Sequence, residues 1–177
     1  MGVSMHVLTS SIFIATLAAH LSPVSQSALL RGHFSLLLSF WVSRGRPGLP
    51  IESFFAKVTP TPTPPGPKPA PSKDALGKEN DVQSHDNPWL SIIQSVIHHP
   101  DEHLVKTVRA LQHYSQIYGG RPKGTFKDTE LEGAEKLDGT LFVRAAGNAM
   151  SALGWVREGE HLGKHDRAGL GWKEAWD

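Results

Sequence analysis

The chain has 177 residues, enough for one domain or for a small domain with tails. Its 18 Lys and Arg residues nearly balance its 17 Asp and Glu residues, and no basic run gives an electrostatic basis for binding nucleic acid. Cysteine is absent, which excludes disulfides, cysteine nucleophiles, iron–sulfur clusters and thiolate zinc sites and favours a reducing, cytoplasmic setting.

The N-terminal region, residues 1–56, has the apolar content of packed helices. The apolar stretch 7–21 lacks the Lys or Arg that precedes the core of a secretory signal, because only His6 stands before it. The stretch 28–42 is shorter than the roughly 20 residues that span a membrane, and it contains Arg31 and His33. We therefore expect buried core helices and no membrane segment here, with a signal peptide that ends near Ala28 as the alternative.

Local signals divide this region into helices. Residues 9–11 (Thr-Ser-Ser) can cap a helix that runs to about His20, and Pro23 separates it from the next one. From about 25 to 43, apolar residues recur at three-and-four spacing, and others widen the stripe almost all the way round. This pattern predicts a buried helix, which the Gly and Pro of residues 44–47 (Arg-Gly-Arg-Pro) bring to an end.

Residues 57–87 are predicted to form a disordered linker or a long Pro-rich loop insertion. Seven prolines between Pro60 and Pro71 favour an extended, polyproline-like chain. Residues 73–86 are polar and charged, which is typical of a solvated segment. A proline-rich ligand for an aromatic groove is the alternative, but nothing basic or repeated frames a docking motif.

Residues 88–177 show the pattern of further helices. Asn87 and Pro88 can open one helix, and residues 100–102 (Pro-Asp-Glu) can open another that ends at the two glycines 119–120. Asp138 is placed to cap a last helix, with Gly154 as its stop. We find no alternating strand pattern of useful length. The sequence therefore predicts an all-α fold of packed helices.

Histidine, with 10 residues, is the enriched ionisable type. His99 and His103 are four residues apart, a spacing that can direct two imidazoles to one side of a helix for a metal ion. Pro100 weakens that geometry, because His99 then more naturally precedes the helix than lies inside it. Since no third ligand is evident, we predict no metal site.

A second pattern places His103, Lys106, Ala110 and Tyr114 on one helical face. Such a face could line a pocket, with His103 as a proton shuttle and Tyr114 as a hydroxyl partner. The polar outer stripe of an amphipathic helix explains the same spacing equally simply. Fingerprints of common enzyme sites give no further help, since Gly-x-Gly-x-x-Gly after a strand, the Walker loop and Gly-x-Ser-x-Gly are all absent.

Four blocks of the sequence, read in order, carry a resemblance to a known family. They are 29–34 (Leu-Leu-Arg-Gly-His-Phe) through 44–47, 99–106 (His-Pro-Asp-Glu-His-Leu-Val-Lys), 137–144 (Leu-Asp-Gly-Thr-Leu-Phe-Val-Arg) and 169–172 (Gly-Leu-Gly-Trp) with Trp176. Residues 5–11 (Met-His-Val-Leu-Thr-Ser-Ser) also look like the family's His-x-x-Thr-Ser segment. Through these blocks the chain resembles the C-terminal part of the questin oxidase-like family, over nearly everything except the linker.

The resemblance implies an incomplete, N-terminally truncated part of a larger helical oxidase fold. It implies an oxidoreductase that inserts oxygen into a polyketide-derived aromatic ketone in the Baeyer–Villiger manner, with NADPH and dioxygen. His6 and His103, in matching segments, are the expected catalytic residues, and Lys106 and Arg144 are expected to bind an anionic group of cofactor or substrate. Blocks 137–144 and 169–176 are expected to serve as scaffold and pocket wall. The alternative is a non-catalytic helical binding or scaffold protein.

Overall fold

A computed structural model describes residues 2–67 and 87–164 of the chain. Within these ranges the chain is helical and contains no strand, so the predicted all-α class is confirmed. The block predicted at 169–176 and most of the predicted linker lie outside the described residues. The division of the chain at residues 56 and 87 stays a prediction.

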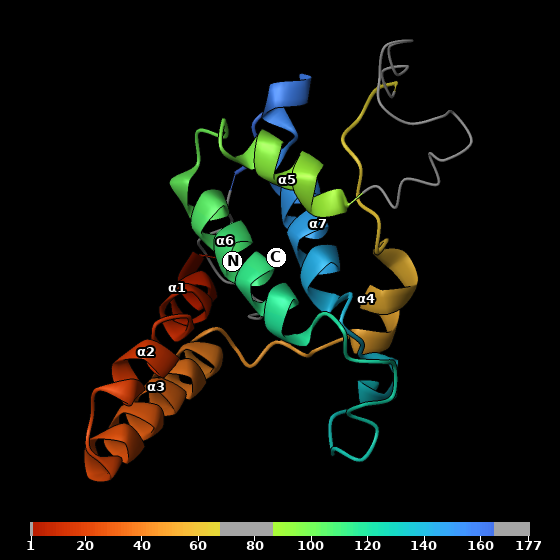
Figure 1. Ribbon diagram of the computed structural model, residues 1–177. Coiled ribbons are helices and arrows are strands. Elements are labelled where there is room, and N and C mark those ends of the chain that lie inside the picture. Colours follow the sequence, from red (N-terminus) through yellow and green to blue (C-terminus); the bar gives the residue numbers. More distant parts are fainter. Residues whose placement is uncertain (1, 68–86, 165–177) are drawn as a thin grey trace, which may run out of the picture.

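The core is built by α5 (Pro88–Val96), α6 (Glu102–Tyr118) and α7 (Leu141–Leu153). Figure 1 shows these helices packed together in the middle of the molecule. Each of the three helices directs an apolar face toward the other two, and these faces form one hydrophobic core. The buried residues of this core are Ile92, Val96, Leu104, Val108, Leu111, Val143, Ala146, Ala149, Met150, Leu153 and Trp155. Burial of these side chains is the main favourable term in the stability of the fold.

The starts of α5 and α6 follow the local sequence as predicted. The side chain of Asn87 accepts a hydrogen bond from the backbone N–H of Trp89 at 3.1 Å, and Pro88 occupies the first helical position, where an N–H is not needed. Asp101 caps α6 in the same way, because its Oδ1 accepts the backbone N–H of His103 at 2.8 Å. Both helix starts are therefore fixed by side chains that are close in sequence.

A turn brings the start of α7 back to the end of α6. Asp138, expected as the cap of this helix, holds the turn just before it: its Oδ1 accepts the N–H of Thr140 at 2.8 Å. The N–H of Gly139 donates to the carbonyl of Arg121 at 2.8 Å, and a side chain at 139 would overlap the backbone of Gly119. This close approach joins the end of α6 to the start of α7, so the two helices run antiparallel.

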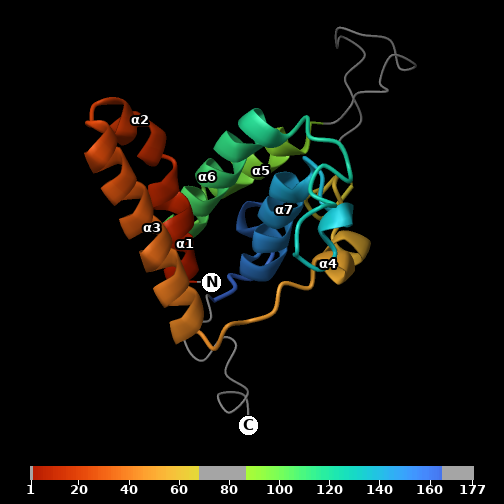
Figure 2. The same cartoon turned by 90° about the horizontal axis from the view of Figure 1, so that it is seen from below.

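Residues 2–43 form an arm beside the core. It consists of α1 (Gly2–Ser11), α2 (Ile14–Ala19) and α3 (Pro23–Ser43). α1 packs against α6 of the core, while α2 and α3 pack against each other and α3 also packs against α1. Figure 2 shows α2 and α3 extending away from the core helices. Among the helices that the structure describes, none is long and apolar enough to cross a membrane.

The structure corrects two predictions for the arm. Residues 9–11 close α1 instead of starting a helix, because their hydroxyls donate back to the carbonyls three residues earlier. The helix predicted between about 25 and 43 forms as α3, but none of its residues is buried by the described part of the chain. Phe34, for example, is 60% exposed. An apolar helix needs neighbours on every side to be buried, and α3 has neighbours on one side.

α4 (Ile51–Lys57) connects the arm to the far end of the core, where it packs beside the short 3-10 helix η1 (Ala134–Lys136). The residues after α4, up to 67, belong to the described part of the predicted linker. Pro62 among them is buried, and a side chain at Gly147 of α7 would overlap its ring. This stretch therefore lies against α7.

Candidate functional site

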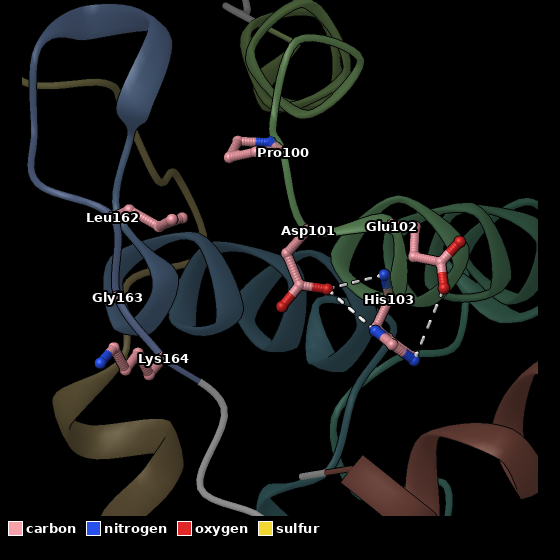
Figure 3. Close-up of a pocket in the computed structure, with 7 residues that line it drawn as sticks. All are labelled: Pro100, Asp101, Glu102, His103, Leu162, Gly163 and Lys164. Carbon is pink, nitrogen blue, oxygen red and sulfur yellow. Dashed lines mark hydrogen bonds and ion pairs between the residues drawn. The ribbon is translucent and has the colours of Figure 1, made fainter.

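A cleft of about 460 Å³ opens at the amino end of α6. One wall is the start of the helix and the other is the segment that follows α7, and the lining residues are Pro100, Asp101, Glu102, His103, Leu162, Gly163 and Lys164. Figure 3 shows these two segments on opposite sides of the cleft. The volume is in the range of roughly 300–1,000 Å³ that is common for small-molecule sites.

His99 fixes the chain just before α6. Its ring is buried, and Nδ1 accepts the backbone N–H of Asp101 at 3.1 Å. An Nδ1 that accepts leaves the proton on Nε2, which then donates to the carbonyl of Leu153 at 3.2 Å. Since both ring nitrogens are engaged, His99 is a structural residue that ties the start of α6 to the end of α7. It is not available as the metal partner that its spacing from His103 suggested.

Asp101 orients the imidazole of His103. Nδ1 of His103 lies 3.0 Å from Oδ1 of Asp101, the same oxygen that caps the helix (Figure 3). A carboxylate at Nδ1 favours the tautomer with the proton on Nδ1 and the lone pair on Nε2. Nε2 lies 4.0 Å from Oε1 of Glu102, and the His103 side chain is 26% exposed. The ring is therefore held by its neighbours and still reachable from the cleft.

His6 of α1 lies against His103. The two ring centroids are 5.9 Å apart and the ring planes meet at 85°, an edge-to-face contact. Further along the same pair of helices, the hydroxyl of Ser11 already donates to the carbonyl of Leu8, so the Tyr114 hydroxyl donates to Ser11 at 2.6 Å. The structure thus brings together the two histidines predicted as catalytic, although they are far apart in sequence.

The helical face that carries Ala110 and Tyr114 is the contact between α1 and α6. Ala110 is fully buried and Tyr114 bonds to Ser11 of α1. Tyr114 is therefore part of a helix interface and not a hydroxyl partner for a substrate in the cleft. Of the predicted pocket face, His103 alone belongs to the residues that line the cleft.

The predicted anion-binding residues lie in different places. The side chain of Lys106 is half exposed, and its ammonium lies 3.5 Å from Oε2 of Glu102, which lines the cleft. Arg144 lies in the first turn of α7, beside the far end of α6. A helix rises about 1.5 Å per residue, so most of the length of α6 separates Arg144 from His103, roughly 20 Å.

Arg144 is engaged in holding α4. Its Nε donates to the hydroxyl of Thr140 at 2.8 Å, and its Nη1 donates to the carbonyls of Phe55, at 3.1 Å, and of Val58. The guanidinium also lies 4.9 Å from the centroid of the Phe55 ring, a cation–π distance. These bonds use three of the five N–H groups of the guanidinium.

Two parts of the site were missed by the sequence. Asp101 was expected only to help open a helix, whereas it also orients His103. An acid two residues before a histidine at a helix start is the signal that could have shown this. The wall at residues 162–164 has no local signal, because it is placed by a long-range bond from the N–H of Gly163 to the carbonyl of Leu153.

Comparison with protein-family models gives a match to the family described as Questin oxidase-like over residues 3–111, more than half of the chain. No curated protein and no solved structure matches. The matched segment contains His6, His103 and Lys106, together with the blocks 29–47 and 99–106. Blocks 137–144 and 169–176 and Arg144 lie beyond it, so the resemblance holds for the N-terminal part of the chain and not for nearly all of it. The chain belongs to the questin oxidase-like family.

Proposed function

We propose that the chain is an oxidoreductase whose acid–base group is His103, positioned by Asp101 and bordered by His6. One observation supports this most directly: Nδ1 of His103 lies 3.0 Å from a carboxylate oxygen in a cleft of about 460 Å³. A fixed tautomer with its lone pair on Nε2 suits proton transfer to or from a bound molecule. The family description names an oxidase, which supports redox chemistry in general.

The proposed reaction is the Baeyer–Villiger-style oxidation of a polyketide-derived aromatic ketone. One atom of dioxygen enters between the carbonyl carbon and its neighbour, which gives an ester, or a lactone where the ketone is part of a ring, and the other atom leaves as water. Addition of a water molecule to the lactone then opens the ring. NADPH supplies the two electrons as a hydride, and one proton completes the balance. The step that we assign to this chain is the transfer of a proton to or from Nε2 of His103. Because cysteine is absent, we propose a reducing, cytoplasmic setting.

The cations of the chain fit an anionic cofactor unequally. Lys106 is half exposed on α6, next to a cleft residue, and Lys164 lines the cleft itself. A mobile ammonium suits a phosphate as a point charge. Arg144 fits less well, because its guanidinium donates to the carbonyls at the end of α4. We therefore propose Lys106 before Arg144 as the residue that holds an anionic group of NADPH.

The test measures NADPH oxidation by the full chain with dioxygen and an anthraquinone. We expect His103→Ala to lower turnover by roughly 10²–10⁴-fold, the usual contribution of a positioned acid–base group. His98→Ala is the matched control, because His98 is exposed and outside the cleft, and it should keep its turnover. Unchanged turnover in His103→Ala, with the fold intact by circular dichroism, would remove His103 from the reaction.

Asp101→Asn separates positioning from folding. Asparagine keeps an oxygen that can cap α6 and removes the charge that faces Nδ1 of His103. We expect a lower kcat with a shifted pH profile and an unchanged KM. If the folded wild-type chain oxidises no NADPH in a ketone-dependent way, the proposal fails and the non-catalytic binding or scaffold alternative is favoured.

A further inference from the structure

A second cleft, of about 360 Å³, lies at the opposite end of α6 from His103. It is formed by the end of α6, the loop that follows it and the start of α7. Its lining is mostly apolar and includes Tyr118, Phe126 and Phe142, with Arg121 and Asp138 as the charged members. All of these residues follow residue 111, where the family match ends. The family relation therefore assigns this cleft no role.

Aromatic rings form one side of this cleft. The rings of Tyr114, Tyr118 and Phe142 have centroids 6.1–6.2 Å apart and planes within 28° of one another. Tyr118 and Phe142 line the cleft, and Phe126, also in the lining, is 41% exposed. Near-parallel rings beside an open cleft favour a flat aromatic ligand, which can lie face to face with one of them at an offset.

Two residues of opposite charge, Arg121 and Asp138, belong to the lining. Oδ1 of Asp138 accepts hydrogen bonds from the N–H and the hydroxyl of Thr140. The backbone carbonyl of Arg121 accepts the N–H of Gly139, which fixes the backbone from which its guanidinium projects. A guanidinium binds a carboxylate through two parallel hydrogen bonds, and a carboxylate accepts from a hydroxyl. A ligand that satisfies both residues carries a carboxylate and a hydroxyl.

We propose that this cleft binds a planar aromatic hydroxy acid. The rings of the ligand lie against Tyr118 and Phe142, its carboxylate contacts Arg121 and its hydroxyl contacts Asp138. The length of α6 separates this site from His103, so the proposal does not rest on the proposed oxidation. The two sites can be tested independently.

The first test is calorimetric titration of the full chain with a hydroxynaphthoate whose hydroxyl and carboxylate are adjacent. We expect saturable binding that Arg121→Gln weakens by roughly tenfold or more, as for loss of a charge-assisted pair. Arg31→Gln is the matched control, because Arg31 is exposed on α3, and it should bind like the wild type. A naphthol that lacks the carboxylate should bind more weakly and respond little to Arg121→Gln.

A second pair of variants tests the aromatic wall. Phe126→Ala should weaken hydroxynaphthoate binding by about threefold to tenfold through lost stacking, and Phe34→Ala, on the exposed face of α3, should not. His103→Ala should leave this affinity unchanged. Circular dichroism of each variant excludes unfolding as the cause. The proposal is overturned if the wild type shows no saturable binding, or if the α3 controls lose affinity as much as the cleft variants.

Discussion

α3 in the arm and α7 in the core are both rich in apolar residues, yet they stand in opposite relations to solvent. The buried residues of α7 are Val143, Ala146, Gly147, Ala149, Met150 and Leu153, whereas α3 has none within the described structure. In α7 the apolar residues share the face that meets α5 and α6. In α3 they surround the helix, and α1 and α2 cover only part of them. Whether an apolar side chain is buried thus depends on which face of the helix it occupies and on whether another helix packs against that face.

Helix α3 exposes several large apolar side chains to solvent. Phe34, Leu37 and Trp41 are 60%, 41% and 39% exposed, on one continuous helix. Soluble proteins rarely leave large side chains exposed side by side, because contiguous apolar surface promotes association. We therefore expect the core to supply most of the free energy of unfolding, whereas α3 of the arm contributes apolar side chains that stay exposed to solvent. This difference can be tested one substitution at a time.

Truncation of a leucine in each region should give the largest contrast. Leu104→Ala, at a fully buried position in α6, should lower the free energy of unfolding by about 2–5 kcal/mol, because it removes packed methyl groups and leaves a cavity. Leu30→Ala, at a position that is 53% exposed on α3, should change it by about 0.5 kcal/mol or less. Urea unfolding of both variants measures the difference. Equal losses would show that the arm contributes to stability as the core does.

Glycine substitution should give effects of opposite sign in the two regions. In Gly147→Ala the new methyl group meets the ring of Pro62, so we expect a loss of about 1–3 kcal/mol. In Gly32→Ala nothing lies within 4 Å of the new methyl group, so the better helix propensity of alanine should add about 0.5–1 kcal/mol. Thermal unfolding resolves the sign. A stabilising Gly147→Ala would show that residues 58–67 do not pack on α7.

The sequence predicts those features that depend on interactions between residues close in the chain. The starts of α5 and α6 were predictable, because Asn87 and Asp101 bond to N–H groups two residues away. The exposure of α3 was not, because an apolar stripe all round a helix indicates burial without naming the neighbours that must supply it. Residues 9–11 were misplaced for a different reason. Their hydroxyls can cap a helix or close one, and spacing alone does not distinguish the two roles.

In the candidate site, too, the sequence indicates residue types but not the contacts that packing creates. The sequence singled out His6 and His103, but their contact arises from the packing of α1 on α6, which no local pattern encodes. The binding of an anionic group by Arg144 stays a prediction, but the sequence could not show what surrounds its guanidinium. Its bonds to the carbonyls of Phe55 and Val58 depend on α4 lying beside α7. Residue type indicates what a side chain can do, and tertiary contacts decide what it does.

The smallest expected effect asks whether the arm unfolds separately from the core. Ser22 caps α3 through a 3.3 Å bond to the N–H of Ser25, and Asn87 caps α5 through a 3.1 Å bond. Loss of either cap costs about 0.5–2 kcal/mol. Because α5 packs on α6 and α7 of the core, Asn87→Ala should lower the global unfolding midpoint. Because α3 packs on α1 and α2 of the arm, Ser22→Ala should speed amide hydrogen exchange in α3 and leave the midpoint unchanged. Hydrogen exchange read by mass spectrometry, with urea unfolding beside it, separates these outcomes. If Ser22→Ala lowered the midpoint as much as Asn87→Ala, arm and core would unfold as one unit, and the exposed helix would be as much a part of the cooperative fold as the buried ones.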